Sequence, residues 1–281
     1  GKNLNHIDYE AIFINDELFL ERTTDLTKIK SAKTSNWTEF NPPKDKLVLH
    51  IRRDVIDYPY LEEIIAWAEN SYGFKFGGIN VMPSIQRYLD DDDNNIFLTA
   101  VNKDLYLPDL LREIRKENLI ENLNKVGYHI EHTRVNRKGR NAEIILKEKG
   151  LDRLIRHNEL SQGLYRTLFI LIYVEYLIQE KQPATIIIDD LCEGLDYERA
   201  TNLGKLLFEK CLNTNVQLIA TSNDSFLMDV IDLKYWNVLQ RKGKTVTAIN
   251  NQNHADLFQK FKFTGLSNFD FFASDFIQQT I

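Results

Sequence analysis

The sequence predicts an α/β fold in which a parallel sheet is flanked by helices. Segments 185–188 and 216–220 are short, mainly apolar and of the kind found in buried strands. An amphipathic helical pattern at 198–212 separates them, and a strongly apolar one at 164–179 precedes them. Two buried strands joined by a helix are typical of a parallel sheet with helices on its faces.

Residues 1–50 are predicted to form a β-rich first part of the fold. Approximate alternation of apolar residues at 6–21, with Asn15 and Asp16 as a turn signal, indicates a hairpin. Segment 46–50 is predicted to be a short strand.

Residues 51–149 are predicted to form a mainly helical insertion lobe. Apolar residues recur at helical spacing after Pro59, a residue that suits a first turn, and again at 108–126. Segments 128–133 and 141–146 alternate, so we expect a hairpin with a basic tip between them.

Residues 150–281 are predicted to form the lobe that carries the chemistry. Beyond the two buried strands, alternating segments around Gly243 predict a closing hairpin. The phenylalanine-rich tail that follows is predicted to serve in core packing or in an interface.

The composition is that of an ordinary globular protein, with 43% hydrophobic and 27% charged residues. The net charge of −6 argues against a protein that coats nucleic acid over its whole surface, but it permits a local basic patch. Two cysteines are too few for a disulfide framework. The longest apolar runs fall short of the roughly 20 residues of a membrane span, which predicts no membrane association and a cytoplasmic location.

The clearest chemical signal is the acidic pair Asp189 and Asp190 at the end of the strand predicted at 185–188. Ligands of α/β folds bind at the carboxyl ends of strands. In phosphoryl-transfer sites one carboxylate there holds Mg²⁺, and a second orients or deprotonates the attacking water. An acidic helix cap is the alternative interpretation. The Gly-Leu-Asp segment at 194–196 follows the acidic pair at a short fixed spacing, and this favours a phosphoryl-transfer site over a helix cap.

Two further segments are predicted to approach the same place. Ser161, Gln162 and Gly163 stand at the start of the apolar helix, where a hydroxyl and free backbone N–H groups suit a phosphate, although such a serine is also a common helix cap. Segment 217–224 is predicted to be a buried strand that ends in polar residues, among them Asn223, at the same sheet edge as the acidic pair.

Together these segments resemble the second half of an ABC-type ATPase of the RecF, SMC and OLD-like group, which has relatives in bacterial phage-defence systems. Segment 160–163 is similar to the signature motif, 186–190 to the Walker B strand, 194–196 to the D-loop and 217–224 to the switch strand. The likeness is tight over 159–250 and looser upstream of it.

The resemblance implies an ABC-ATPase head that binds ATP and Mg²⁺ and pairs with a second ATPase subunit around the nucleotide. Carried over by position, the residues implied for catalysis are Asp190 and Asn223, and the residue implied for Mg²⁺ is Asp189. The residues implied to contact the partner's nucleotide or to line the dimer seam are Ser161, Gln162, Gly163 and Asp196.

Three features depart from the family pattern. No G-x-x-x-x-G-K-[ST] P-loop occurs in the sequence. Because the P-loop precedes a stretch like 6–21 in this group, we expect it upstream of Gly1; the alternative is a subunit that has lost nucleotide binding. Asp190 is one methylene shorter than the usual glutamate, and Asn223 replaces a histidine and cannot carry a proton at neutral pH. Both changes predict slow hydrolysis.

The predicted function is an ATP-binding, slowly hydrolysing subunit that dimerises head to head and switches a DNA-linked or anti-phage defence complex with an effector nuclease. The alternatives are a non-hydrolysing scaffold or regulatory subunit, and an α/β domain whose acidic strand end only caps a helix. The basic hairpin tip is a candidate DNA-backbone contact, since phosphate binding needs only Lys or Arg, and a solvated loop is the alternative interpretation. Its residues are Arg134, Arg137, Lys138 and Arg140.

Overall fold

The computed structural model describes residues 6–75, 107–138 and 141–273. Contacts divide the chain into two compact units, Gly1–Asn70 and Ser71–Ile281. The boundary between them falls inside the region predicted at 51–149.

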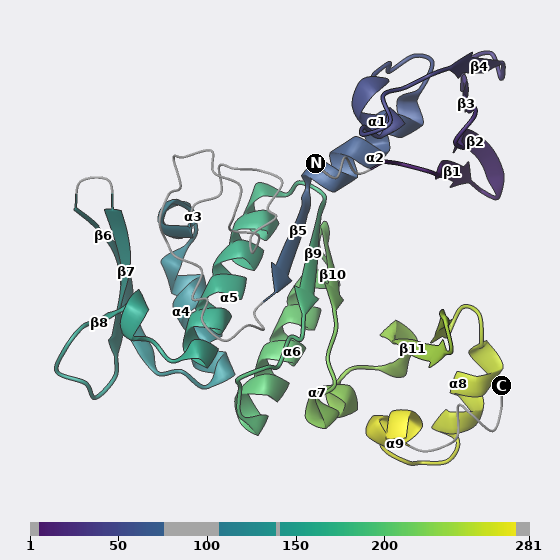
Figure 1. Ribbon diagram of the computed structural model, residues 1–281. Helices are drawn as coiled ribbons and strands as arrows, with labels where there is room; N and C mark the ends of the chain where they lie inside the picture. The colour runs from purple at the N-terminus through teal and green to yellow at the C-terminus, as the bar shows by residue number, and fades with distance from the viewer. Residues whose placement is uncertain (1–5, 76–106, 139–140, 274–281) are drawn as a thin grey trace. The chain divides into compact units, whose positions relative to one another are not determined.

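The first unit combines an antiparallel sheet with two helices (Figure 1). Asn15 and Asp16 both adopt left-handed backbone angles, with φ of 50° and 66°, as tight hairpin turns require, so the hairpin predicted at 6–21 is confirmed. Pro59 is the first residue of its helix, as predicted. The elements in chain order are β1 (Glu10–Ile14), β2 (Glu17–Arg22), β3 (Thr27–Lys30), β4 (Trp37–Phe40), α1 (Val48–Ile51) and α2 (Pro59–Glu69).

Segment 46–50 is not the short strand that its alternation predicts, because Val48–Ile51 forms one helical turn, α1. The carboxylate of Glu10 accepts the first helical N–H at 3.0 and 3.1 Å. Arg22 donates to the carbonyl oxygen of Lys46 at 2.7 Å. These side chains satisfy backbone groups that a strand would pair with a neighbouring strand. Tertiary partners therefore override the local pattern.

The second unit is built on a three-stranded parallel sheet in the order β10-β9-β5, that is Val216–Ala220, Ala184–Asp189 and Ser71–Lys75. Helix α5 (Gln162–Glu180) precedes β9, and helix α6 (Tyr197–Cys211) connects β9 to β10. The predicted α/β class, with a parallel sheet flanked by helices, is confirmed. Strand β5 lies in a region that the sequence predicts to be mainly helical.

Helix α5 covers one face of the parallel sheet. Phe74 of β5 is buried beneath α5, where its ring centroid lies 5.4 Å from that of Phe169 and 5.1 Å from that of Tyr173. On the opposite face Ile187 and Ile219 are 38% and 44% exposed, so the prediction that β9 and β10 are buried strands is wrong for this face. The core of the unit therefore lies between the sheet and α5.

Two helices and a small antiparallel sheet precede α5 in this unit. Helix α4 packs against both α5 and α6 and contributes Leu119 and Leu123 to the core. The hairpin predicted between 128 and 146 is confirmed. These elements are α3 (Leu107–Glu113), α4 (Lys116–Val126), β6 (Ile130–Lys138), β7 (Asn141–Glu148), β8 (Ile155–Arg156) and the short 3-10 helix η1 (His157–Glu159).

The carboxyl-terminal part of the unit has a small hydrophobic core of its own. Phe271 packs against Phe258 and Phe261, with centroid distances of 4.8 Å to each, so the predicted packing role of the tail is confirmed for these three residues. Phe263 is 92% exposed and takes no part in this core. The hairpin predicted around Gly243 is also confirmed. The elements are α7 (Ser225–Val230), η2 (Leu233–Tyr235), β11 (Asn237–Lys242), β12 (Thr245–Asn250), α8 (Ala255–Lys262) and α9 (Asn268–Ala273).

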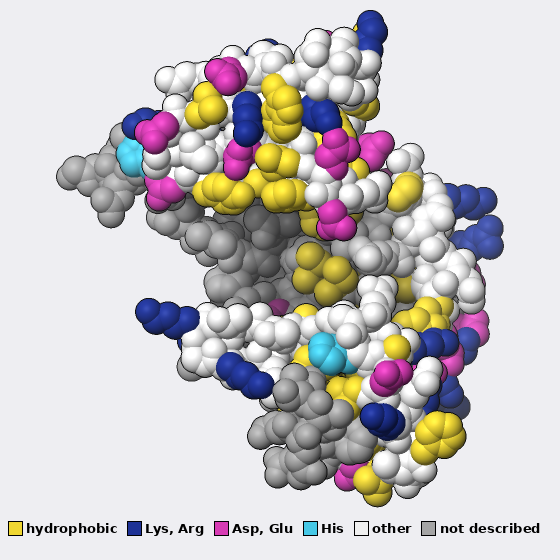
Figure 2. All heavy atoms as spheres, turned by 90° about the vertical axis from the view of Figure 1, so that its right-hand side faces the viewer, with side chains coloured by type: hydrophobic (Ala, Val, Ile, Leu, Met, Phe, Trp, Pro, Cys, Tyr) yellow, Lys and Arg dark blue, Asp and Glu magenta, His cyan; other side chains and the backbone are white. Residues whose placement is uncertain are grey.

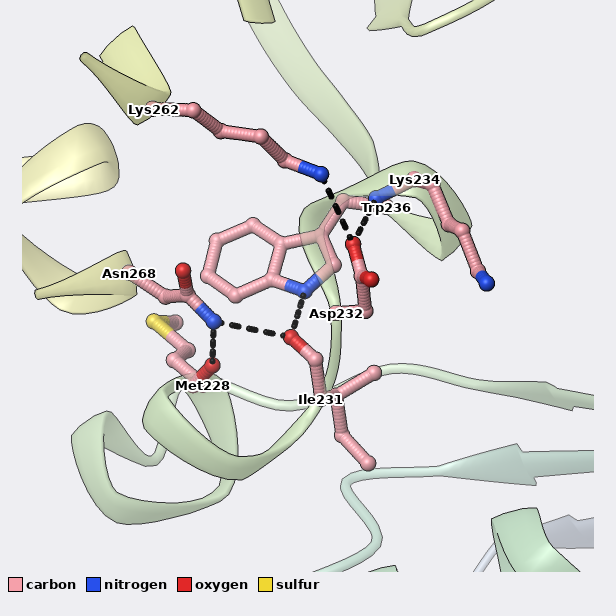
Figure 3. A network of polar contacts seen from close by, with 7 residues as sticks. All are labelled: Met228, Ile231, Asp232, Lys234, Trp236, Lys262 and Asn268. Carbon is pink, nitrogen blue, oxygen red and sulfur yellow. Dashed lines mark hydrogen bonds and ion pairs between the residues drawn. The ribbon is translucent and has the colours of Figure 1, made fainter.

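A polar network attaches this small core to the end of α7 (Figure 3). The amide of Asn268 donates to the carbonyl oxygens of Met228 (3.2 Å) and Ile231 (3.0 Å). The indole N–H of Trp236 donates to the same Ile231 oxygen at 3.0 Å. Both lone pairs of that carbonyl are therefore used, which fixes α9 against α7. Of the helices that the structure describes, none combines the length and the apolar character needed to cross a bilayer.

Candidate functional site at the end of strands β9 and β10

The carboxyl ends of β9 and β10 meet at one edge of the parallel sheet. Ala220 pairs with Ile188, so the residues that follow them, Thr221 and Asp189, lie side by side. The hydroxyl of Thr221 donates to Asp189 Oδ1 (2.8 Å) and accepts the backbone N–H of Asp190 (2.9 Å). The prediction that the acidic pair and the polar end of the neighbouring strand share one edge is confirmed.

Asp190 has a backbone conformation that few non-glycine residues adopt. Its φ is 55°, in the left-handed region, which Asp and Asn tolerate better than most side chains. Thr221 holds the chain on both sides of this residue, because its carbonyl also accepts the N–H of Leu191 at 2.9 Å. Such conformations persist where the surroundings fix them, and they concentrate at functional sites.

A buried arginine of α5, Arg166, contacts the turn that follows β9. One guanidinium nitrogen donates to the carbonyl oxygen of Asp190 at 2.7 Å, and the other donates to that of Glu193. The carboxylate of Glu193 lies 3.6 Å from the guanidinium, whose side chain is 5% exposed. Burial lowers the pKa of Arg166, and the negative charges of Glu193 and Asp190 oppose that shift. Arginine keeps its charge in proteins, so the contact is charge-assisted.

The signature-like segment at the start of α5 packs against its own chain. Ser161 is the N-cap of α5, and its hydroxyl accepts the N–H of Leu164 at 3.3 Å. Gly163 is buried, and a Cβ there would lie 2.8 Å from the carbonyl oxygen of Gly194, so this close approach requires glycine. Ser161 and Gln162 are exposed.

Asp196 is exposed at the N-cap of α6. Its carboxylate accepts the backbone N–H of Arg199 (3.0 Å) and pairs with the side chain of that arginine, which together hold the pKa of the carboxyl below its usual range. The guanidinium of Arg199 lies 4.7 Å from the ring centroid of Tyr128. Through the cap and the cation–π contact, Arg199 thus fixes the start of α6 against the segment that follows α4.

Asn223 lies two residues beyond Thr221 and is exposed, in the short connection to α7. The next residue, Asp224, caps α7 by accepting the N–H groups of Phe226 (3.0 Å) and Leu227 (2.8 Å). The structure therefore brings Asn223 to the edge where the acidic pair emerges. Thr221, which binds the pair, precedes it, and Asp224, which caps α7, follows it.

Cys192 lies in the turn after Asp190 and is buried. Burial raises the pKa of its thiol to about 12, so the group is neutral at physiological pH. A neutral buried thiol is a poor nucleophile, and Cys192 serves in packing.

Of the four basic residues predicted to contact DNA, two are described with their side chains. Arg134 is exposed on β6. Arg137 is half exposed and forms an ion pair with Asp109 of α3. Lys138 ends β6, and Arg140 lies outside the described residues.

The sheet edge fits one part of an Mg²⁺–ATP site. Mg²⁺ takes few protein carboxylates and completes its coordination with water and substrate phosphates, which matches Asp189 with the hydroxyl of Thr221 beside it. Among the residues that the structure describes, no three or more His, Cys, Asp or Glu side chains are grouped to enclose a metal. The sequence holds no P-loop, so a cradle for the β- and γ-phosphates is not supplied by the segments described above.

Sequence reasoning did not single out Thr221 or Arg166, although both have a recognisable signal. Thr221 is the first residue after a mainly apolar strand whose parallel partner ends in Asp189, and equal strand ends bring such residues together. Arg166 is a cation inside a mainly apolar helix, and a buried arginine requires polar partners.

No protein-family model and no curated protein matches this sequence. Among solved structures, the chain is similar to one described under "ATP-driven dimerization and DNA stimulated activation of SMC ATPases", with 15% identity and a TM-score of 0.41 over 56% of this chain and 97% of that one. It is similar to the SMC head domain from Thermotoga maritima, with 13% identity and a TM-score of 0.41 over 89% of this chain and 76% of that one.

It is also similar to the Smc head domain from Pyrococcus furiosus bound to the C-terminal domain of ScpA, with 15% identity and a TM-score of 0.40. That match covers 54% of this chain and spans 38% of the Pyrococcus chain.

Proposed function

We propose that this chain is the catalytic part of an ATP-binding, slowly hydrolysing ABC-type head that pairs with a second copy around nucleotide. The observation that carries the proposal is the arrangement of Asp189, Thr221 and Asp190 at the shared end of two parallel strands. This is the edge at which α/β sheets bind their ligands. The motif order in the sequence, from Ser161 to Asn223, supports the same assignment.

Each residue of the edge has a chemical task in this proposal. The carboxylate of Asp189 holds Mg²⁺, with Thr221 orienting that carboxylate by hydrogen bond. When bound, Mg²⁺ neutralises charge on the transferring phosphoryl group. Asp190 orients or deprotonates the attacking water, and Asn223 donates a hydrogen bond to the γ-phosphate. The short carboxylate arm of Asp190 makes this chemistry slow.

The partner-facing side of the head is proposed to include the exposed start of α5. Ser161 and Gln162 are exposed at a helix N-terminus, where anions bind favourably, and Gly163 allows that start to lie close to Gly194. Asp196, exposed at the next helix N-terminus, lines the seam between heads. ATP and Mg²⁺ are the proposed ligands, and the head is proposed to switch a DNA-linked or anti-phage defence complex with an effector nuclease.

ATP-dependent dimerisation and hydrolysis, measured on the intact protein, test this proposal. Sedimentation velocity with ATP and Mg²⁺ is expected to show dimers that disappear with ADP. Phosphate release is expected at less than about 1 s⁻¹, the lower end of ordinary enzyme turnover.

Dimers that form with ATP but release no phosphate would support the alternative, a non-hydrolysing scaffold with the same fold. The absence of both nucleotide binding and dimerisation would contradict the proposed function. A fast turnover, comparable with that of metabolic enzymes, would contradict the assignment of Asp190 and Asn223 to slow hydrolysis.

A further inference from the structure

The side chain of Arg166 contacts backbone carbonyl groups of the turn after β9, and not only a side chain of that turn. Its two terminal nitrogens donate to the carbonyl oxygens of Asp190 (2.7 Å) and Glu193, three residues apart in one turn. A planar guanidinium spans two such acceptors with a rigid fork of two nitrogens and little loss of side-chain freedom, whereas lysine has a single nitrogen on a flexible stem. The ion pair with the Glu193 carboxylate, at 3.6 Å, is longer, and that carboxylate is 47% exposed. The carbonyl bonds are therefore the principal contact.

The turn itself has few internal restraints. Asp190 and Gly194 both adopt left-handed angles, with φ of 55° and 78°. Two backbone hydrogen bonds cross the turn, from Glu193 to Asp190 (3.2 Å) and from Leu195 to Cys192 (3.1 Å). A turn of this kind needs outside contacts to keep one conformation.

Those outside contacts come from two opposite sides of Asp190. The Thr221 hydroxyl accepts its N–H, and Arg166 donates to its C=O. One turn earlier in α5, Gly163 allows the helix to touch the carbonyl of Gly194. Helix α5 therefore contacts this turn at two places. Arg166 contacts the first part of the turn, at Asp190, and Gly163 lies against its last part, at Gly194.

We infer that Arg166 is a positioning residue for Asp190, which makes the start of α5 and the second carboxylate of the site one rigid unit. The inference deepens the proposed function and rests on it for its kinetic consequence. A contact of the partner's nucleotide with Ser161 and Gln162 would move the start of α5. Because α5 holds Asp190 through Arg166, Asp190 would move with it. The acidic residue would then reach its working position only when the two heads are closed on nucleotide.

Arg166→Lys tests the positioning role because it keeps the charge and removes the two-point contact. Without nucleotide, amide hydrogen exchange is expected to rise about tenfold or more in 190–196 and to stay unchanged in the core of α5, because a charge-assisted bond to the turn is lost. Arg241→Lys is the matched control, since Arg241 donates to the carbonyl of Gly243 in an exposed hairpin turn. Unchanged exchange in 190–196 would overturn the inference.

The kinetic arm compares ATP turnover of the same two variants. Arg166→Lys is expected to lower kcat about tenfold to a hundredfold with KM nearly unchanged, because the carboxylate is misplaced while the binding groups remain. A loss confined to KM would contradict a positioning role. If the wild-type protein shows no turnover, the proposed function fails, and the exchange measurement still decides the positioning role.

Two further variants keep the inference falsifiable if Arg166→Lys does not fold. Gly163→Ala pushes against the carbonyl of Gly194 and is expected to accelerate exchange in the same turn; Gly73→Ala, where a Cβ meets open space, is its control. Glu193→Gln keeps both carbonyl bonds and is expected to leave the exchange of the turn unchanged. Faster exchange in that variant would show that the ion pair, not the two-point backbone contact, holds the turn.

Discussion

At the scale of single residues, the hydroxyl of Thr221 joins the two acidic positions of the site. It donates to the Asp189 carboxylate and accepts the N–H of Asp190, so one oxygen fixes both a side chain and a strained backbone. The two acidic residues and their chemistry were predictable from the strand that precedes them. The hydroxyl was not singled out, because its importance depends on which strand lies next to β9 and in which register.

Thr221→Val is expected to lower the free energy of unfolding by about 1 kcal/mol and ATP turnover of the intact protein about tenfold or more. Valine has the same shape but neither donates to Asp189 nor accepts from Asp190. Thr221→Ser retains the hydroxyl and should remain close to wild type in both measurements. Urea unfolding and phosphate release check the pair of variants. Equal behaviour of the valine and serine variants would show that the hydroxyl does not organise the site.

At the scale of elements, a buried polar cluster joins three helices behind the sheet. Glu175 of α5 is nearly buried and contacts Lys210 of α6 at 2.5 Å and the amide of Asn122 of α4 at 2.6 Å. A buried charge is costly alone, but its partners come from the two helices that pack on α5. This cluster fixes the rotation of α5, the helix that carries Ser161 at one end.

Breaking this cluster and replacing it should have opposite consequences. Glu175→Ala alone is expected to destabilise the protein by about 3–5 kcal/mol, because it leaves Lys210 without its buried carboxylate. The double variant Glu175→Leu with Lys210→Met is expected to recover part of that loss, because it removes both charges but leaves the buried amide of Asn122 without its acceptor. Thermal or urea unfolding measures both. A double variant as unstable as the single one would show that the pair supplies packing or specificity that apolar side chains cannot replace.

The elements also show why part of the fold was predictable and part was not. Strands β9 and β10 and helices α5 and α6 carry their periodicity in the sequence, and the structure places them within a few residues of the predicted ranges. Strand β5, Ser-Tyr-Gly-Phe-Lys, is short and contains a glycine, so only pairing with β9 makes it a strand. The single turn of α1 depends on Glu10, which is distant in sequence. In both cases, contacts with residues distant in the sequence determine the secondary structure.

At the scale of the whole molecule, the charge distribution bears on how the protein would bind DNA. The net charge is −6, and on the face shown in Figure 2 the described Lys and Arg side chains are interspersed with Asp and Glu. A protein of this charge would bind DNA through a local basic contact rather than over its whole surface. The hairpin of β6 and β7 is the proposed contact, and Arg134 is exposed there while Arg137 pairs with Asp109.

Arg134→Glu is therefore expected to weaken binding of duplex DNA more than Arg137→Glu. Each lost phosphate contact should reduce the slope of log affinity against log salt by about 1, without changing ATP turnover. Fluorescence anisotropy at several salt concentrations measures the slope. Arg241→Glu, on the β11–β12 hairpin, is the control for charge alone. Equal losses in all three variants would indicate binding through net charge and contradict a contact at this hairpin.

Asp190 is proposed to perform the hydrolytic step at the end of β9, and Asp190→Asn tests this role most directly. Asparagine also tolerates the left-handed conformation, so the variant removes the charge and retains the backbone. Asp16→Asn is the matched control, because Asp16 has a similar φ of 66° in a hairpin turn of the other unit. Phosphate release and sedimentation of the intact protein with ATP are measured for both. We predict that Asp190→Asn loses about a hundredfold or more in turnover and accumulates ATP-bound dimer, while Asp16→Asn behaves as wild type. Undiminished turnover in Asp190→Asn would contradict this role.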